Sequence, residues 1–437
     1  MFTNFLPLAS EIAELRTCFR CGYVSSVGSG SLEVRGLGPV ARVGDLVELE
    51  AAGDEVLRGE IVAITRESAR VMMYSACEGV GLNVVARLVP ISGPRPDESW
   101  KGRIIDAFGN PLDGRPLPRG AAEADLKAVP PAAAQRAALG KRLKTGEAAL
   151  DTMLPLVRGQ RIGIFAGSGV GKSSLLARLA RGVEADIVVF ALIGERGREL
   201  RHFTDHVLGE AGMARSVVIT ATSDQSPLIK RRAAWMAMSV AEYFRDQGKH
   251  VLFLADSVTR LAEAHREVAL TAGEAPSLRA FPPSTSNLIA NFAERAGPGP
   301  VGAGHITAVF SVLVAGSDME EPVADITRGL LDGHVVLSRE IAERGRFPAI
   351  DVRRSVSRSL PDAATAEENA LIERTRALLG AYEMAEPMIQ TGLYTPGSDP
   401  EIDAAIVIWP KLDAFFARQY PGGPAEAFAA LKLCFEG

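Results

Sequence analysis

Short apolar runs alternate with longer amphipathic stretches through the middle of the chain, between residues 145 and 360. Short apolar runs bounded by turn residues are typical of buried strands, whereas an apolar period of 3.6 residues, as in 226–247, indicates a helix. Their alternation predicts an α/β fold, in which helices cover both faces of a mostly parallel sheet. The predicted strands are 161–165, 186–193, 216–221, 250–255 and 305–314.

A different pattern precedes this region. Between residues 22 and 92, short segments such as 46–50 and 59–64 alternate apolar and polar positions, and glycine-containing turns separate them. This spacing of short strands favours a small β-barrel, which we assign to residues 22–95.

The remaining segments are connections or helices. Residues 102–114 resemble a strand and a turn, and 118–140 are rich in Pro and Ala, which indicates an extended connection. Strand signals fade after Leu360, and 367–388 has a helical pattern, as does the stretch that begins at Ser398-Asp399-Pro400-Glu401. We expect four parts: an N-terminal helix over 1–21, a barrel over 22–95, an α/β domain over 96–360 and a helical domain over 361–437.

The apolar stripe of the first 20 residues fits two interpretations, a helix docked on its own domain or a helix that binds a partner. The same segment carries Glu11 and Glu14 and lacks the uninterrupted apolar core of a signal peptide. The longest apolar stretch, 306–315, is interrupted by Thr307 and Ser311 and is too short to span a membrane. We therefore expect a cytoplasmic protein, or one attached peripherally to a membrane.

Composition narrows the class of protein. The chain has 437 residues, of which 47% are hydrophobic and 23% charged, as in ordinary globular proteins of two to four domains. The net charge of −5 provides no global basic surface for nucleic acid, so no nucleic-acid partner is expected.

Cysteine and histidine patterns do not indicate a metal site. Four cysteines are too few for a disulfide scaffold and suggest a reducing compartment. Cys18 and Cys21 form a single C-x-x-C without a second pair nearby, so we expect them to pack rather than bind metal. His202 and His206 are expected to share a helix face without a ligand role.

The strongest chemical signal follows the predicted strand 161–165, where residues 166–174 read A-G-S-G-V-G-K-S-S ahead of an apolar-periodic run. Strand, glycine-rich loop and helix form the context of a phosphate-binding loop, whose amides and helix N-terminus attract phosphate. Ala166 stands where the motif begins with glycine. Lys172 would reach the β- and γ-phosphates, and the Ser173 hydroxyl would bind Mg²⁺. The candidate nucleotide-binding residues here are Gly167, Ser168, Gly169, Val170, Gly171, Lys172, Ser173 and Ser174.

Carboxylates at the ends of two other predicted strands complete the candidate site. Asp256 ends an apolar strand, where it can hold Mg²⁺ through water. Glu195 and Glu199 follow the strand 186–193, where a carboxylate could polarise the water that attacks the γ-phosphate. The residues alone do not rank these two glutamates, and either could be a solvated surface charge.

Five motifs together resemble those of the rotary-type hexameric ATPases, and among these the ATPases of type III protein export, most of all the flagellar export ATPases. They are A-G-S-G-V-G-K-S, I-G-E-R-G-R-E, L-F-L-A-D-S-V-T-R, L-L-D-G-H-V-V-L-S-R and F-P-A-I-D-x-x-x-S-V-S-R. The resemblance extends over nearly the whole chain and implies a RecA-like ATPase core between a small N-terminal β-barrel and a C-terminal α-helical domain. It also implies ATP and Mg²⁺ as ligands.

The resemblance assigns roles to individual residues. Glu195 matches the glutamate that activates water, and Arg196 beside it would orient the site. Phe347 falls where the family has an aromatic ring against adenine, although a buried core Phe is the alternative. Arg358 matches an arginine finger that reaches into the neighbouring subunit, which implies a homohexamer. Arg353 and Arg354 lie close to Arg358, and without the resemblance the three arginines cannot be ranked.

The resemblance also implies an activity and partners. The expected function is ATP hydrolysis that energises export of flagellar proteins, at the inner face of the bacterial cytoplasmic membrane. Expected partners are an export regulator, stalk-like and export-gate proteins, export substrates and their chaperones. The stretch 277–288 departs from the lysine–glycine–aromatic run usual in the export family.

Other functions remain open on the residues alone. A virulence type III secretion ATPase would share every catalytic motif. The catalytic subunit of a rotary ATP synthase would have a longer, more acidic tail after Arg358. An RNA-translocating ring helicase would carry aromatic residues on its barrel, where Tyr23 stands alone before Tyr74. A non-catalytic subunit is disfavoured by the presence of Lys172, Glu195 and Arg358.

Overall fold

The computed structural model describes residues 19–38, 40–51, 55–90, 92–314 and 318–436. Residues 1–18 of the predicted N-terminal helix lie outside these residues, Cys18 among them, whereas residues 19 and 20 are not helical and Cys21, the predicted last residue of that helix, begins a strand. The described residues form two compact units: one contains residues 19–92 together with 225–228 and 264–276, and the other contains the rest.

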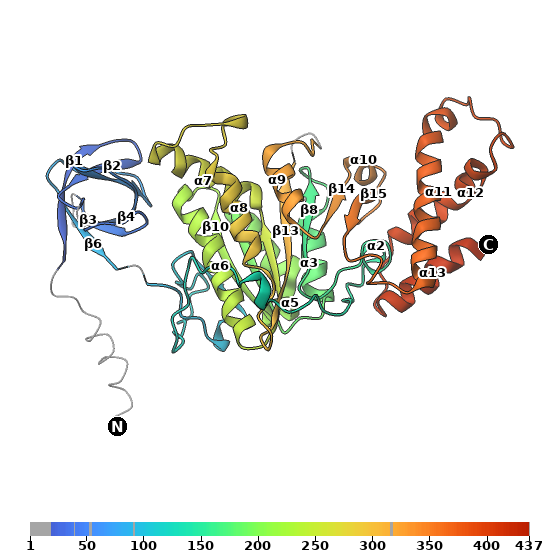
Figure 1. Ribbon diagram of the computed structural model, residues 1–437, viewed down its shortest axis with the longest axis horizontal. Coiled ribbons are helices and arrows are strands. Elements are labelled where there is room, and N and C mark those ends of the chain that lie inside the picture. The colour runs from blue at the N-terminus through green and yellow to red at the C-terminus, as the bar shows by residue number, and fades with distance from the viewer. Residues whose placement is uncertain (1–18, 39, 52–54, 91, 315–317, 437) are drawn as a thin grey trace, which may run out of the picture. The chain divides into compact units, whose positions relative to one another are not determined.

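The first unit contains a closed six-stranded barrel, as the sequence predicts, with strand order β1-β2-β5-β4-β3-β6 (Figure 1). Buried and exposed positions alternate along β1, β2 and β3, which sends every second side chain into the barrel. Val24, Val34, Val47 and Val71 are fully buried in its core. The strands are β1 (Cys21–Val27), β2 (Ser31–Arg35), β3 (Leu46–Glu50), β4 (Val56–Ile64), β5 (Ser68–Met73) and β6 (Val85–Val89).

The second unit is built around a sheet with strand order β15-β14-β8-β13-β11-β9-β10-β7, parallel except at β15. The five predicted strands all form, and the pattern at 102–114 contributes β7 (Arg103–Ile105) at one edge. The others are β8 (Arg161–Ala166), β9 (Ile187–Glu195), β10 (Ser216–Thr222), β11 (His250–Asp256), β12 (Gly297–Pro298), β13 (His305–Leu313), β14 (Gly333–Leu337) and β15 (Ile350–Ser357).

Three strands in this sheet were not predicted: the two-residue β12, which pairs antiparallel with β13, and β14 and β15. The sequence D-V-R-R-S-V-S of β15 belongs to an edge strand, which exposes Arg353, Arg354 and Val356 and so lacks a continuous apolar run. The adjacent β14 starts at Gly333 and His334 and pairs in parallel with β8.

Helices cover both faces of the sheet (Figure 1), because the central strands are buried on both sides. One core includes Leu175, Leu176 and Phe190, and the other includes Phe165, Phe244 and Phe253. The α-helices that lie between β7 and β15 along the chain are α2 (Ala148–Asp151), α3 (Lys172–Gly182), α4 (Gly197–His202), α5 (Gly209–Ala214), α6 (Pro227–Asp246), α7 (Val258–Ala272), α8 (Ser284–Glu294), α9 (Pro322–Leu330) and α10 (Arg339–Glu343). Short turns of 3₁₀ helix are η1 (Glu98–Trp100), η2 (Ala133–Gln135) and η4 (Leu278–Ala280), and η3 (Phe203–Leu208) is a π-helical turn.

The C-terminal residues are helical, as predicted: α11 (Ala366–Gln390) and α12 (Pro400–Phe416) correspond to the two helical patterns of the sequence, and α13 (Pro424–Glu436) is a further helix. Thr365 and Glu368 form a capping box at the start of α11, and the Asp399 side chain caps α12, so local residues determine both starts. Ile372, Leu412, Phe415 and Phe428 join the same core as α3, which packs these helices onto the nucleotide-binding sheet.

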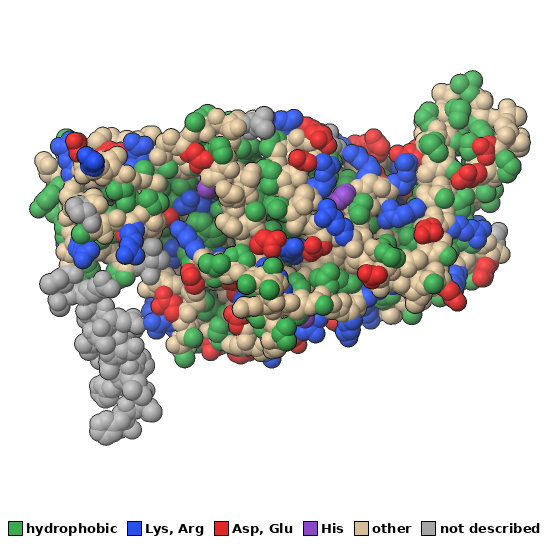
Figure 2. All heavy atoms as spheres, viewed as in Figure 1, with side chains coloured by type: hydrophobic (Ala, Val, Ile, Leu, Met, Phe, Trp, Pro, Cys, Tyr) green, Lys and Arg blue, Asp and Glu red, His purple; other side chains and the backbone are tan. Residues whose placement is uncertain are grey.

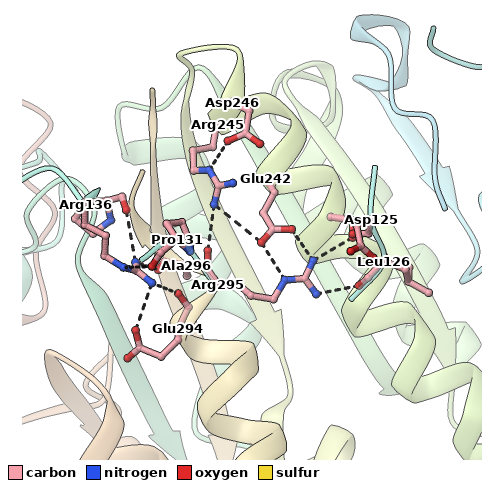
Figure 3. A network of polar contacts seen from close by, with 12 residues as sticks. Asp125, Leu126, Pro131, Arg136, Glu242, Arg245, Asp246, Glu294, Arg295 and Ala296 are labelled. Atoms are coloured by element: carbon pink, nitrogen blue, oxygen red, sulfur yellow. Dashed lines mark hydrogen bonds and ion pairs between the residues drawn. The ribbon is translucent and has the colours of Figure 1, made fainter. Parts of the chain in front are cut away.

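Charged side chains, some of them buried, hold the extended connection 118–140 to the sheet unit (Figure 3). Arg136 donates to the backbone carbonyls of Glu294 and Ala296 and pairs with the Glu294 carboxylate at 3.4 Å. Nearby, Arg295 pairs with Glu242 at 2.5 Å and donates to the Leu126 carbonyl at 2.9 Å. Arg295 and Glu242 are almost fully buried, so each charge depends on the other.

Candidate active site

The phosphate-binding loop has the predicted strand–loop–helix context. β8 ends at Ala166, and α3 begins at Lys172 with Gly171 as its N-cap. Gly169 and Gly171 adopt φ angles of +79° and +86°, which favour glycine because a Cβ would be strained there. No side chain caps α3, so its first amides are available to an anion. Val170 is buried, whereas Ser168, Ser173 and Ser174 are exposed.

Three side chains from separate elements meet beside this loop. The Lys172 ammonium forms an ion pair with the Asp256 carboxylate at the end of β11, and its Nζ lies 4.0 Å from Oε1 of Glu195 at the end of β9. Asp256 is 3% exposed, and its Oδ1 accepts a hydrogen bond of 2.7 Å from the Ser311 hydroxyl. The fold thus brings together the lysine and two of the carboxylates predicted from the sequence.

Burial changes the acidity of Glu195. Loss of solvent around its carboxyl, reinforced by the charge of Asp256, raises the pKa of Glu195 to about 7, although Lys172 opposes the shift. A carboxylate with a pKa near neutrality is suited to accept a proton from water. Glu199, the other candidate, is exposed on α4, where its carboxyl shares a hydrogen bond with Glu195 and contributes to the raised pKa, whereas Glu195 itself lies beside Lys172. The geometry therefore ranks Glu195 above Glu199.

Arg196 lies at the margin of this cluster. Its side chain is 70% exposed, and its guanidinium lies 3.6 Å from the carboxylate of Glu199. The backbone of Arg196 forms the N-cap of α4. Although Arg196 follows Glu195 in the chain, its guanidinium is directed to Glu199 and not to Glu195.

Phe347 lies against the phosphate-binding loop. A Cβ built on Gly171 would be 3.2 Å from Cδ1 of Phe347, so the ring and the loop are in close approach. Phe347 is 42% exposed, which does not fit the alternative of a buried core residue. An exposed ring beside a phosphate-binding loop offers a stacking surface for a nucleotide base.

Arg358 lies at the opposite end of the sheet from Phe347. Leu337 of β14 pairs with Ala166 of β8 next to the loop, and β15 then runs back antiparallel until Ser357 pairs with Gly333. The exposed Arg358 follows at once.

The two competing arginines differ in their surroundings. Arg353 forms an ion pair with Glu383 of α11, which holds its guanidinium against the C-terminal helices. Arg354 is exposed, and its carbonyl lies 3.0 Å from Nε2 of His334. Arg353 therefore has a partner in its own chain.

The sequence analysis did not identify Ser311 as a site residue. Its only signal was a hydroxyl that, like Thr307, interrupts a mainly apolar predicted strand, and the pairing of β13 with β11 is what places it beside Asp256.

The remaining metal candidates are not supported by the described part of the chain. No group of three or more His, Cys, Asp or Glu side chains suited to a metal ion occurs among the residues the structure describes. His202 and His206 do lie together, with ring centroids 5.3 Å apart. Cys21, Cys77 and Cys434 are free thiols.

The residues present fit a magnesium nucleotide. The uncapped amides of α3 and the Lys172 ammonium suit phosphate, while the Ser173 hydroxyl and the Asp256 carboxylate are oxygen donors of the kind that Mg²⁺ prefers. Phe347 would then lie on the side of the loop where a base can stack.

Comparison with known proteins identifies the family of the chain. Residues 146–357 match the nucleotide-binding domain of the ATP synthase alpha/beta family, and residues 364–430 match the T3SS EscN ATPase C-terminal domain. The Flagellum-specific ATP synthase of Caulobacter vibrioides is 46% identical over 404 residues, 91% of each chain. The Type 3 secretion system ATPase of Pseudomonas syringae pv. tomato is 42% identical over 419 residues, 94% of this chain and 92% of its own.

A solved structure shows the same architecture. The assembled ATPase EscN of the enteropathogenic E. coli type III secretion system has a TM-score of 0.87 and 36% identity, covering 95% of this chain and 99% of its own. A second structure of EscN, in complex with its central stalk EscO, has a TM-score of 0.83. The chain therefore belongs to the ATP synthase alpha/beta family of ATPases, in the group that contains the flagellum-specific ATP synthases and the type III secretion ATPases.

Proposed function

We propose that this protein hydrolyses ATP in a Mg²⁺-dependent reaction and that a homohexameric ring of it energises export of flagellar proteins. Relatives named flagellum-specific ATP synthase support the flagellar assignment, at 46% identity in Caulobacter vibrioides and 41% in Bacillus subtilis. A virulence type III secretion ATPase is the second candidate, because such a relative is 42% identical. The match of residues 364–430 favours an export ATPase over the catalytic subunit of a rotary synthase.

The placement of Arg358 carries the proposal of a shared active site. Strand β15 spans eight residues from Ile350 to Ser357, so at about 3.3 Å per residue Arg358 lies roughly 25 Å along the strand from the Phe347 end. An arginine that far from its own phosphate-binding loop cannot stabilise charge there. Because β15 is the edge strand of the sheet, its end is available to another copy of the chain. Arg358 would therefore complete the site of a neighbouring subunit.

The chain's own groups then have distinct roles in hydrolysis. The loop amides and Lys172 hold the phosphates, Phe347 stacks on the base, and Ser173 and Asp256 are the residues that would hold Mg²⁺, Asp256 through water. When bound, the ion neutralises charge on the phosphate oxygens. Glu195 accepts the proton of the attacking water, and Arg358 of the neighbour stabilises the charge of the transition state. Arg196 keeps the start of α4, and with it Glu195, in place.

The proposed partners follow from exposed apolar residues on the C-terminal helices. Met384 and Leu393 are 74% and 77% exposed at the tip formed by α11 and its following loop, a region where Figure 2 shows hydrophobic side chains on the surface. We infer that this tip contacts a stalk-like protein, as the complex of EscN with its central stalk supports. An export regulator, gate proteins, substrates and chaperones complete the proposed set.

The proposed location is the cytoplasm, at the inner face of the cytoplasmic membrane. None of the helices in the described residues combines the length and the apolar character needed to cross a bilayer. Attachment would therefore be peripheral, through protein partners.

Two measurements test the proposal. Phosphate release by the purified protein should require Mg²⁺, and its specific activity should rise with protein concentration as subunits associate. Specific activity that is independent of concentration down to fully monomeric protein would contradict a shared site.

A genetic complementation test separates the two export functions. Expressed in a bacterium that lacks its flagellum-specific ATPase, the chain should restore swimming, and the Lys172→Ala variant should not. Restored secretion of virulence effectors without restored motility would favour the second candidate.

A further inference from the structure

We propose that Gln160 is a positioning residue for Arg358, and that it acts through Ser357 and the backbone of Asp332. This inference rests on the proposed role of Arg358 in the neighbouring subunit's site. It concerns the accuracy with which the exposed arginine is presented, because an arginine finger stabilises charge only when its backbone is held at a defined position.

Two buried serines hold the chain on either side of Arg358. Ser357 and Ser359 are 8% and 9% exposed, and their hydroxyls lie 2.6 and 2.9 Å from the carbonyl oxygen of Pro155. The two hydroxyl oxygens are also 2.8 Å apart. Alternation along the chain sends both serine side chains inward and Arg358 outward. The exposed arginine therefore stands between two fixed neighbours.

Gln160 connects these anchors to the rest of the sheet. Its side chain is fully buried, and its Nε2 donates to the Ser357 hydroxyl and to the Asp332 carbonyl, both at 3.1 Å. The same Asp332 carbonyl accepts the backbone N–H of Arg358 at 3.0 Å. The Oε1 of Gln160 accepts the Val157 N–H at 2.9 Å, so both polar atoms of the Gln160 side-chain amide are hydrogen-bonded.

Charged groups support Asp332 from the other side. The Asp332 carboxylate accepts the Arg161 N–H at 3.0 Å and pairs with the Arg161 guanidinium at 3.3 Å. Arg161 pairs in turn with Glu294 at 2.6 Å, and Glu294 pairs with Arg136 of the connection (Figure 3). Asp332 is thus fixed at both its backbone and its side chain.

The position of Gln160 separates this role from the chain's own phosphate-binding loop. Gln160 precedes β8 and the loop follows it, so the six residues of β8 place them roughly 20 Å apart. All side-chain hydrogen bonds of Gln160 go to Val157, Asp332 and Ser357. Loss of this side chain should therefore impair the finger that a subunit donates, and leave its own nucleotide site intact.

Steady-state kinetics give the first test. Gln160→Met retains the length of the side chain without its polar atoms, and Ser357→Ala removes one anchor with less risk to folding. We expect kcat to fall about 10- to 100-fold for Gln160→Met and less for Ser357→Ala, because displacement of a catalytic group by about 1 Å has effects of this size. KM for ATP should remain within about twofold, since ground-state binding is not altered.

Mixing of subunits gives a readout that general damage would not produce. Lys172→Ala subunits lack a working nucleotide site but retain Arg358 and its anchors. Mixed in equal amounts with Gln160→Met subunits, they should form interfaces of which about one in four combines an intact site with an intact finger. Activity should then exceed that of either variant alone, because a loss of about 10- to 100-fold leaves Gln160→Met well below the roughly one quarter of full activity that the mixed interfaces supply. Ser357→Ala should show the same gain only if its own loss of kcat exceeds about threefold.

Ser355→Ala is the matched control. Ser355 is fully buried in the same strand and bonds to Val336 and Asp351, not to the residues beside Arg358. The Ser355→Ala variant should be less stable, and Lys172→Ala subunits should not raise its activity.

The same experiment distinguishes failure of this inference from failure of the proposed function. If Arg358→Ala is rescued by Lys172→Ala subunits and Gln160→Met is not, the positioning role is wrong and the shared site stands. Unchanged kcat in Gln160→Met would also overturn it. If Arg358→Ala is not rescued, the shared site itself fails, and the inference fails with it.

Discussion

Replacing Glu195 by glutamine removes a charge that the folded protein holds at a cost. Burial and the charge of Asp256 raise the pKa of Glu195 from 4.5 to about 7. At 1.36 kcal/mol per pH unit, the ionised carboxylate costs the folded state roughly 3 kcal/mol. A raised pKa means that protonation favours the folded state, so this cost is absent below pH 4.5 and complete above about pH 7. Glu195→Gln should therefore stabilise the protein above pH 7 and have little effect near pH 4.5.

The same substitution should remove most of the turnover. General base catalysis contributes about 10²- to 10⁴-fold, so kcat should fall by this factor while nucleotide binding is retained. In the unmodified protein, kcat/KM should rise with pH up to an inflection near 7, because the ionised form of Glu195 accepts the proton. The variant's residual activity should lack this inflection.

Three measurements check these expectations: urea unfolding at several pH values, phosphate release across pH, and nucleotide binding. Glu199→Gln is the matched control, because it makes the same chemical change on an exposed neighbour and should retain turnover. The inflection of this control should lie at lower pH, because Glu199 contributes to the raised pKa of Glu195. Turnover of Glu195→Gln within tenfold of the unmodified protein, or an unchanged inflection, would refute the reasoning.

Phe347→Ala should raise KM for ATP about tenfold, equivalent to roughly 1.4 kcal/mol, with little change in kcat, because in the proposed site the ring would stack on the base and would not touch the reacting phosphate; an unchanged KM in steady-state assays would exclude stacking. Glu242→Gln should destabilise the protein by about 3–5 kcal/mol in urea unfolding, because it leaves the buried Arg295 charge without a counter-ion. Gly182→Ala should cost about 1–3 kcal/mol by the same assay, because the new Cβ would lie 2.3 Å from the carbonyl oxygen of Thr145; equal unfolding midpoints would contradict that clash.

Parts of the candidate site could be predicted because their signals are local. The phosphate-binding loop depends on a strand, glycines with positive φ and a helix start that are continuous in the chain. Asp256 was predictable because it ends an apolar strand, and in a parallel sheet such ends meet at one edge. Ser311 was not, because the register between β13 and β11 joins segments about 50 residues apart.

The amino-acid sequence by itself determined the α/β fold, the barrel, the C-terminal helices and the nucleotide-binding loop, since hydrophobic periodicity and turn residues act over short stretches of chain. Without the family resemblance, the sequence did not rank Glu195 over Glu199; the tertiary structure does, because it places Glu195 beside Lys172 and leaves Glu199 more exposed. The antiparallel edge strand β15 also places Arg358 far from the phosphate-binding loop of the same chain. Burial and strand order depend on contacts between distant segments, and these contacts have no local signal in the sequence.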